Sequence, residues 1–296
     1  GAQSTGNVVT GNIIGLGDDG ITRLSNRFSG VALTDAVNNT IGGDAASLGN
    51  LISGNGGIFN SLLFRGGGIL ISGTATGNKI QGNFIGTDLN GVPQADTGNF
   101  SDGIKIQQGA SNNIIGLDAT GSGLRNIIAG NGEIDESGVT VVDNNSQNNR
   151  ISGNSIFGNL TTGIDLGGDG TTANDADDSI TGPNNLQNYP VLTSAVYDNA
   201  ALELTATFSV PSDPTNSDYP LRIEFYKNSG NRQGEVYLGS AQYETADFES
   251  DKTVVVTLAA SDLVVEGDEI TALAISSTGN TSEFGGTVPV EAALTA

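Results

Sequence analysis

The sequence contains no histidine, cysteine, methionine or tryptophan, and only 11 of its 296 residues are lysine or arginine. Without cysteine there is no disulfide framework, thiolate metal site or thiol nucleophile. Without histidine, the common zinc sites and the catalytic triads that use histidine as a base are excluded. Any chemistry that remains must use carboxylates together with lysine or arginine.

Positive charge is scarce relative to negative charge, since 33 Asp and Glu residues give a formal net charge of −22 at pH 7. This much negative charge repels nucleic acid and anionic membrane surfaces, so neither is an expected partner. No apolar run approaches the roughly 18–20 residues of a membrane span, so we expect no membrane insertion. The acidic, cysteine-free composition is typical of exported bacterial surface proteins, and we predict an extracellular or cell-surface location.

What the sequence has in abundance is a repeat built on Gly-Asn pairs. The segment 78–86 (NKIQGNFIG) recurs as 7–15 (NVVTGNIIG) and as 149–157 (NRISGNSIF). The third and eighth positions are aliphatic in all copies, whereas the second and seventh vary. A fixed apolar position beside a variable one is the pattern of a half-buried strand. Gly-Asn suits a sharp corner between two such strands because both residues tolerate positive φ.

A second repeated element begins each turn of this pattern. Its five copies have aliphatic residues at the first and third positions after a glycine, and they lie at 30–34, 68–72, 103–107, 138–142 and 163–166. Three short strands per turn, each stacked on its equivalent in the next turn, predict a parallel β-helix with asparagine ladders at its corners. The residue between the two aliphatic positions varies, and we expect it to lie on the outer face: Ala32, Leu70, Lys105, Thr140 and Asp165.

The segments 77–88 (GNKIQGNFIGTD) and 109–116 (GASNNIIG), with 163–167 (GIDLG) leading into 182–190, resemble the right-handed parallel β-helix repeat proteins of bacterial surfaces. The resemblance covers about residues 5–190 and implies their fold. It implies little about activity, because the family includes structural proteins as well as relatives of polysaccharide-cleaving enzymes. We therefore expect residues 1–188 to form a right-handed parallel β-helix.

The composition changes near residue 183, since 37 of the 44 glycines precede it and all six tyrosines follow it. Apolar and polar residues then alternate in short segments such as 201–208 and 221–226, which are separated by turn sequences such as 213–216. Seven strands in about 105 residues, without helical periodicity, predict an immunoglobulin-like antiparallel β-sandwich over residues 189–296. The whole chain is therefore predicted to be all-β.

The clearest candidate for a ligand site is an acidic loop at the end of the repeat. Residues 167–178 (GGDGTTANDADD) offer carboxylates, an amide and free carbonyls, which are the ligands that Ca²⁺ prefers. Two interpretations stay open: a structural Ca²⁺ site that holds the last coil, and a solvated loop that caps the β-helix. The predicted metal ligands are Asp165, Asp169, Asn174, Asp175, Asp177 and Asp178.

Catalytic residues are harder to find, and we assign none. The polysaccharide lyases related to these β-helices use Asp-bound Ca²⁺ and a basic residue, which draws attention to Lys105 and the neighbouring Asp102. A solvated outer face explains these residues as well. A glycosidase needs two carboxyls about 5–10 Å apart, and Asp135 and Glu136 share one loop, although nothing else marks them.

These observations favour a non-enzymatic structural or adhesive module of a cell surface or extracellular matrix, including a fibre subunit. The open strand edges of a β-helix can pair between copies, so self-association is one expected interaction and an extracellular glycan is the other. The alternative is a polysaccharide lyase or hydrolase that acts on the loop face. The loops expected on that face are 42–49, 58–67, 87–102, 116–124 and 132–137.

Overall fold

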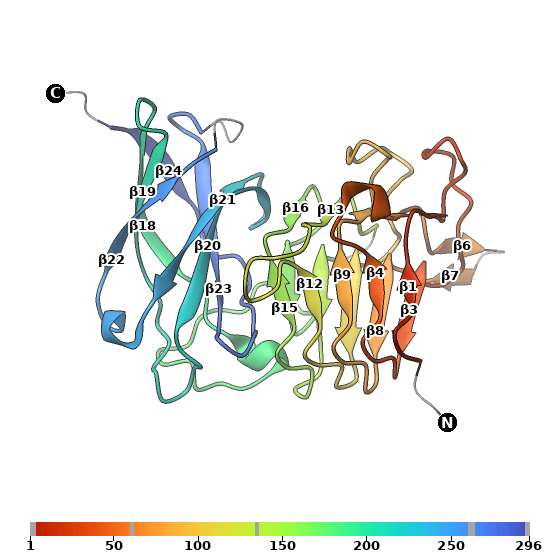
Figure 1. Cartoon of the computed structure of the whole chain (residues 1–296), viewed down its shortest axis with the longest axis horizontal. Helices are drawn as coiled ribbons and strands as arrows, with labels where there is room; N and C mark the ends of the chain where they lie inside the picture. Colours follow the sequence, from red (N-terminus) through yellow and green to blue (C-terminus); the bar gives the residue numbers. More distant parts are fainter. Residues whose placement is uncertain (1–3, 60–61, 134–135, 260–263, 294–296) are drawn as a thin grey trace.

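The computed structural model describes residues 4–59, 62–133, 136–259 and 264–293. The described chain is built almost entirely of strands, which form three parallel five-stranded sheets, one seven-stranded sheet and a two-stranded hairpin. Its helical segments are three short 3₁₀ turns, η1 (Ala46–Leu48), η2 (Pro183–Leu186) and η3 (Thr245–Asp247). The parallel sheets form one half of the molecule and the seven-stranded sheet forms the other (Figure 1). The prediction of an all-β chain is confirmed.

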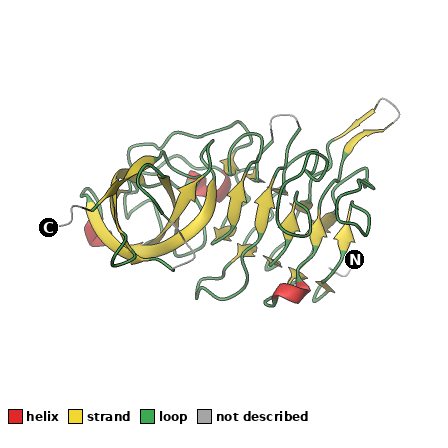
Figure 2. Cartoon of the chain, turned by 90° about the horizontal axis from the view of Figure 1, so that it is seen from above, coloured by secondary structure: helices red, strands yellow, loops and turns green. Residues whose placement is uncertain are grey.

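The chain passes through the three parallel sheets in a fixed rotation, so that each turn adds one strand to each sheet (Figure 2). The result is a β-helix-like repeat. The first sheet contains β1 (Val8–Val9), β4 (Thr40–Gly42), β9 (Lys79–Gln81), β12 (Ile114–Gly116) and β15 (Arg150–Ser152). The second contains β2 (Ile13–Ile14), β5 (Leu51–Ile52), β10 (Phe84–Ile85), β13 (Ile127–Ala129) and β16 (Ser155–Phe157). The third contains β3 (Val31–Thr34), β8 (Ile69–Ser72), β11 (Ile104–Gln107), β14 (Val139–Val141) and β17 (Ile164–Leu166).

The strand register of the third sheet reproduces the variable column expected from the sequence. Lys105 pairs with Leu70 on one side and with Thr140 on the other, and Thr140 pairs with Asp165. The aliphatic residues that flank Lys105 are fully buried in one hydrophobic core that extends through the coil. The alternation therefore separates core from outer face at Leu70 and Lys105, as a strand requires. Thr140 and Asp165, which were expected on the same solvated face, are buried, with 3% and 6% of their surface exposed.

Asparagine ladders hold the corners of successive turns together. At Asn126, the side-chain amide donates to the Oδ1 of Asn154 and to the carbonyl of Ile80, while its own Oδ1 accepts from the backbone and side chain of Asn83. The residue before a ladder asparagine often adopts positive φ, as Gly82 does at 69° before Asn83, but Gly49, before Asn50, has a φ of −61°. Two ladders were predicted and the third was not. They run through Asn7, Asn39, Asn78, Asn113 and Asn149; through Asn12, Asn50, Asn83, Asn126 and Asn154; and through Asn26, Asn55, Asn99, Asn131 and Asn159.

The loops leave the coil at two of its three corners, as the sequence predicts. Between the first and second sheets, long connections occur in two turns, at 43–50 and 117–126, and the other three are corners of two or three residues. The connections from the second to the third sheet are the longest in most turns, and those from the third to the first are turns of five to eight residues. One predicted loop, 58–67, contains regular structure that was not expected. It includes a hairpin of β6 (Gly57–Phe59) and β7 (Leu62–Phe64), which lies at the N-terminal end of the coil (Figure 1).

The C-terminal half contains the seven strands that the sequence predicts, and the alternating segments 201–208 and 221–226 coincide closely with two of them, β19 and β20. They form one sheet in the order β21-β20-β23-β24-β18-β19-β22. Its edge strands β21 and β22 contact each other, so the sheet nearly closes into a barrel (Figure 2). The strands are β18 (Val191–Asp198), β19 (Glu203–Ser209), β20 (Leu221–Asn228), β21 (Gly234–Tyr243), β22 (Lys252–Thr257), β23 (Glu269–Ile275) and β24 (Val288–Ala292).

Purely antiparallel pairing, which the sequence analysis predicted, is wrong at one place. Strand β18 pairs antiparallel with β19 but parallel with β24, where Ala195 faces Val290. This parallel pair joins the first strand of the C-terminal half to the last one, and so connects its two antiparallel groups into one mixed sheet. Phe208, Phe225 and Tyr243 fill the interior that the sheet encloses.

The seven-stranded sheet covers the last turn of the coil. Phe284, which follows β23, is buried in the coil's own hydrophobic core beside Tyr226. The carboxylate of Glu224 accepts hydrogen bonds from Ser152 Oγ at 2.7 Å and from the backbone N–H of Gly153 at 2.8 Å. These contacts give hydrogen-bond partners to polar groups at the end of the coil that would otherwise have none within the protein.

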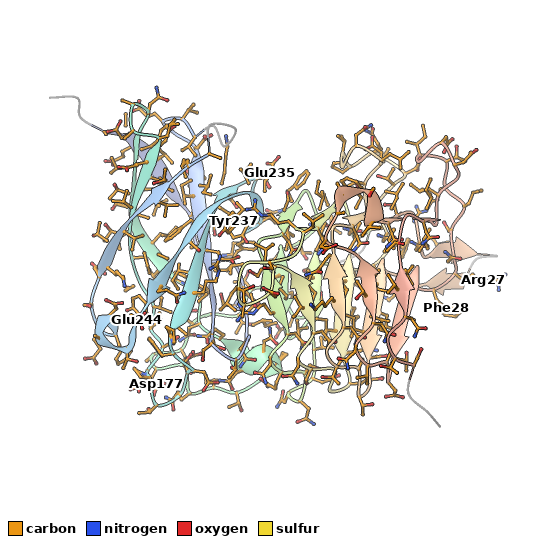
Figure 3. The ribbon with its side chains drawn as sticks, viewed as in Figure 1. Arg27, Phe28, Asp177, Glu235, Tyr237 and Glu244 are labelled. Carbon is orange, nitrogen blue, oxygen red and sulfur yellow. The ribbon has the colours of Figure 1, made fainter. Side chains whose placement is uncertain are left out.

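Two of the three asparagine ladders continue beyond the coil. The backbone N–H of Asn149 donates to the side chain of Asn184 in η2, at 3.0 Å. The third ladder continues into the seven-stranded sheet, because Asn159 donates through both its backbone and its side chain to Gln233 Oε1. Tyr237 of β21 lies at the same junction (Figure 3), and the guanidinium of Arg125 stands 4.2 Å from the centre of its ring.

Candidate functional site

The residues predicted to bind calcium lie between the coil and the seven-stranded sheet, in two groups. The first group contains Asp165 and Asp169. The buried carboxylate of Asp165 accepts hydrogen bonds from the backbone N–H groups of Gly168 and Gly170, at 2.9 and 3.1 Å. Burial raises the pKa of Asp165 above its ordinary value. Asp169 is exposed to solvent.

The second group fastens the segment that leads into β18. Asn174 makes two hydrogen bonds to the backbone of Tyr189, and Asp175 accepts from the amide of Asn188. Asp178 accepts from the side chain of Gln187 and the backbone of Asn188. Burial raises the pKa of Asp178 to about 6. Asp177 lies on the outside of the junction (Figure 3) and accepts from Ser179 Oγ.

These six residues do not fit a single calcium cage. Among the described residues, no three acidic side chains are arranged so that they could hold a metal ion together. A Ca²⁺ site needs six to eight oxygen ligands around one centre, whereas most of these carboxylates already accept hydrogen bonds from backbone and amide groups. Their arrangement is that of a fastened linker, and calcium binding stays a prediction.

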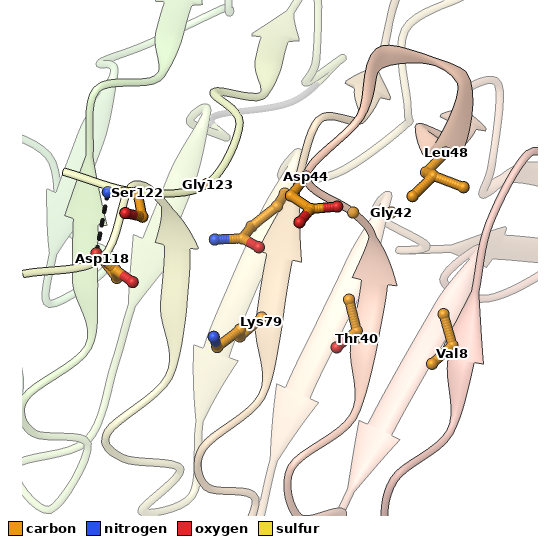
Figure 4. A pocket seen from close by; sticks show the side chains of 11 residues that line it. Val8, Thr40, Gly42, Asp44, Leu48, Lys79, Asp118, Ser122 and Gly123 are labelled. Carbon is orange, nitrogen blue, oxygen red and sulfur yellow. Dashed lines mark hydrogen bonds between the residues drawn. The ribbon is translucent and has the colours of Figure 1, made fainter. Parts of the chain in front are cut away.

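A groove of about 360 Å³ lies on the outer face of the first sheet (Figure 4). Thr40 and Lys79 form its floor, and the loops 42–48 and 118–123 form its walls. Asp118 on one wall accepts hydrogen bonds from Thr120 and Ser122, and the Thr120 hydroxyl is the main cause of its lowered pKa. The groove therefore offers an exposed ammonium group between two carboxylate-bearing loops, which belong to the predicted loops 42–49 and 116–124.

A more enclosed cavity of about 280 Å³ lies on the outer face of the third sheet. Leu70 and Lys105 form its floor, and Arg65, Asp102 and Glu136 line its sides. Lys105 Nζ is 3.4 Å from Asp102 Oδ2, and Arg65 forms an ion pair of 2.7 Å with Glu136. The cavity brings together the Lys105 column and two loops that are far apart in the sequence.

Asp102 is the most unusual residue of this cavity. Its side chain is only 1% exposed, and its Oδ1 accepts from the backbone N–H of Ser137 and the hydroxyl of Thr140. Its Oδ2 is buried and accepts no hydrogen bond from an N–H or hydroxyl group of the described residues, although the carboxyl of Glu136 can donate to Asp102 when it is protonated. Burial, and then the nearby negative charge of Asp102, raise the pKa of Glu136 to about 7. Near neutral pH the carboxyl of Glu136 is therefore partly protonated.

The sequence analysis identified parts of this cavity without joining them. It singled out Lys105 with Asp102, and separately Asp135 with Glu136; Asp135 lies outside the described residues. It missed Arg65, which follows the unexpected hairpin. The column spacing could have placed Asp102 beside Thr140, one turn further along the coil. Nothing in the sequence indicates that loops around residues 65 and 136 meet above Lys105.

Comparison with known proteins gives little further information. No protein-family model matches the chain, and neither does any curated protein. Among solved structures, the chain is similar to the adhesin domain of Epf from Streptococcus pyogenes, with 11% sequence identity and a TM-score of 0.27. That match covers 37% of this chain and 34% of the other. A similarity this low supports no conclusion about function. Within the described residues, no helix is long and apolar enough to cross a membrane.

Proposed function

We propose that this chain is a non-enzymatic structural and adhesive module of an extracellular or cell-surface protein. Its coil is a right-handed parallel β-helix, and its C-terminal half is an immunoglobulin-like sandwich fixed rigidly to the end of that coil. The observation that carries this proposal is the passage of an asparagine ladder from Asn159 into Gln233. A shared hydrogen-bond ladder, unlike a flexible linker, makes two modules move as one body.

The strand order supports the immunoglobulin-like assignment. Strands β18, β19 and β22 form one antiparallel group, and β21, β20, β23 and β24 form another. The first and last strands join the groups by parallel pairing, which leaves the two groups facing each other across a shared core. Sandwiches of this architecture occur as spacers and binding modules in many cell-surface proteins.

Polymerisation by stacking of coil ends is disfavoured by this arrangement. The C-terminal end of the coil is covered by Phe284, Glu224 and the rest of the seven-stranded sheet. The other end presents the edges of β1, β2 and β3, beside the 68% exposed side chain of Phe28 (Figure 3). One open end allows pairing with one partner only, so a fibre would need a further contact surface.

Scanning calorimetry of the whole chain tests the rigid module. We expect one cooperative transition whose calorimetric enthalpy equals its van't Hoff enthalpy. A Phe284→Ala variant, which leaves a cavity between the two halves, should split that transition into two. Two separate transitions in the unmodified chain would refute the rigid connection. A glycan array probed with the intact chain tests the adhesive part of the proposal.

A second candidate, a polysaccharide lyase or hydrolase, is favoured by one observation. Glu136, whose pKa is about 7, lies in one cavity with Lys105 and Asp102, so a proton donor, a base and a cation are close together. Groups with pKa values near the working pH suit general acid–base catalysis. Incubation with acidic and neutral polysaccharides, followed by assays for unsaturated uronates and new reducing ends, tests this alternative. If the unmodified chain releases such products and a Glu136→Gln variant does not, the result would favour the enzymatic function.

A further inference from the structure

We propose that the cavity lined by Asp102, Lys105, Arg65 and Glu136 binds one sugar unit of a glycan through neighbouring hydroxyl groups. This inference rests on the proposed adhesive role and assigns it a site and a ligand class. The cavity opens on the outer face of the third sheet, whose strands β8 and β11 supply its floor. Strands give such a site a fixed geometry, which loops alone do not.

The buried acceptor of Asp102 is the first argument for a ligand. A buried carboxylate oxygen without a hydrogen-bond partner is costly, because its desolvation is not compensated. Asp102 Oδ1 is fully engaged by Ser137 and Thr140, which fixes the carboxylate and leaves Oδ2 at the cavity. Lys105 approaches Oδ2 at 3.4 Å without forming a hydrogen bond. A protonated Glu136 is the donor that the protein itself supplies to Asp102, and a hydroxyl of a ligand would take its place when Glu136 is ionised.

The mixture of charges in the cavity selects the class of that donor. An ammonium ligand would meet Lys105 and Arg65, and a phosphate or sulfate would meet Asp102 and Glu136. A neutral ligand avoids both repulsions. It must donate to Asp102 and accept from Lys105 and Arg65, which have more N–H donors than the contacts within the protein use. A hydroxyl group donates once and accepts twice, so adjacent hydroxyls on a sugar ring match this set.

The size and the floor of the cavity agree with a single ring. Its volume of about 280 Å³ lies just below the range, roughly 300–1,000 Å³, that small-molecule sites occupy, so it has room for one ring at most. The half-buried side chain of Leu70 supplies an apolar surface beside Lys105, against which the C–H face of a ring can pack. A longer glycan would then extend outward over the face of the third sheet.

Ligand-observed NMR with the intact chain tests this inference. The probes are the methyl glycosides of glucose, galactose and mannose, with methylammonium and acetate as the two charged alternatives. We expect at least one glycoside to bind with a Kd on the order of 1 mM, as suits a few hydrogen bonds in a small site. Asp102→Asn should weaken that binding at least tenfold. Glu136→Gln, which preserves the shape of the loop, should do the same if Asp102→Asn fails to fold.

An Asp96→Asn variant is the matched control, because Asp96 is an exposed carboxylate of the loop 86–102 outside the cavity. It should bind the glycoside as the unmodified chain does. The inference is wrong if no glycoside binds, if methylammonium or acetate binds more tightly, or if binding survives both cavity substitutions. The last result would place the glycan elsewhere, for example in the groove of the first sheet. None of these results affects the calorimetric test, so the proposal of a rigid module can be correct even if the proposed sugar site is wrong.

Discussion

Gln233 occupies the position that the next asparagine of the ladder would have above Asn159. Its Oε1 accepts from the backbone N–H and the side-chain amide of Asn159 at 3.0 and 3.1 Å, and its Nε2 returns a bond of 2.8 Å to the Asn159 carbonyl. Inside the coil, Asn131 makes the same pair of bonds to Asn159 Oδ1, both at 3.0 Å. Gln233, in the hairpin between β20 and β21, thus makes the hydrogen bonds that an asparagine in one further turn of the coil would make.

Replacement of Gln233 by alanine should lower the free energy of unfolding by about 1–3 kcal/mol, because it leaves two buried donors of Asn159 without acceptors. Urea denaturation measures this loss. Gln242→Ala is the control, since Gln242 is an exposed glutamine of the same strand, β21. Equal losses in the two variants would mean that the continued ladder adds no stability.

The repeat was predictable because its physical cause is local. A corner such as Gly82-Asn83 needs positive φ and then a side-chain amide, and both requirements appear directly in the sequence. The same signal stands at Gly130-Asn131 and Gly158-Asn159, where the third ladder was overlooked although the Gly-Asn pairs are visible. The strands of the C-terminal half were predictable from alternation for the same reason.

The junction and the two surface sites were not predictable in this way, because they depend on contacts between distant segments. Nothing near Gln233 in the sequence resembles a ladder corner. The parallel pairing of β18 with β24 depends on how the sheet closes, which alternation does not specify. In the acidic loop, closeness in sequence does not give a common centre, since adjacent residues such as Asp177 and Asp178 make separate contacts.

The loss in the free energy of unfolding when a ladder asparagine is replaced should depend on the position of that asparagine in its ladder. Asn126 is fully buried and bonded on both sides, whereas Asn12 is an exposed first member bonded on one side only. We expect Asn126→Ala to cost about 2–4 kcal/mol, and Asn12→Ala less than about 1 kcal/mol, since only the former leaves buried groups unpaired. Urea denaturation of both variants measures the difference. Similar losses would indicate that the ladder bonds contribute little.

Calcium should have little effect on stability, because the six acidic-loop residues do not share one centre. We expect the melting temperature with about 2 mM CaCl₂ to agree with that in excess chelator to within about 1 °C. A ligand that binds only the folded state at 100 times its Kd would add about 2.7 kcal/mol, which is easily seen. A clear rise in the melting temperature with calcium, absent in an Asp175→Asn variant, would instead show that the acidic loop binds calcium.

Glu283 should make the junction less stable as the pH rises. Burial is the main cause that raises its pKa to about 8, with the charge of Asp165 adding to the shift and that of Arg232 opposing it. In the unfolded chain the pKa returns towards 4.5. The folded protein therefore binds the proton more tightly, so the stability contributed by neutral Glu283 is complete below about pH 4.5 and is lost as the pH rises to about 8.

A Glu283→Gln variant separates this effect from the similar contributions of Asp178 and Glu136. Glutamine stays neutral at every pH, and its single Oε1 can accept only one of the two backbone bonds, from Leu166 or from Thr172, so the variant also loses some stability by an amount that does not depend on pH. Between about pH 5 and pH 9, the unmodified chain should lose on the order of 1–3 kcal/mol more stability than the variant. Glu291→Gln, an exposed glutamate of β24, should retain the full loss. If Glu283→Gln shows the same pH dependence as the unmodified chain, Glu283 is already ionised in the fold, and the junction tolerates a buried charge.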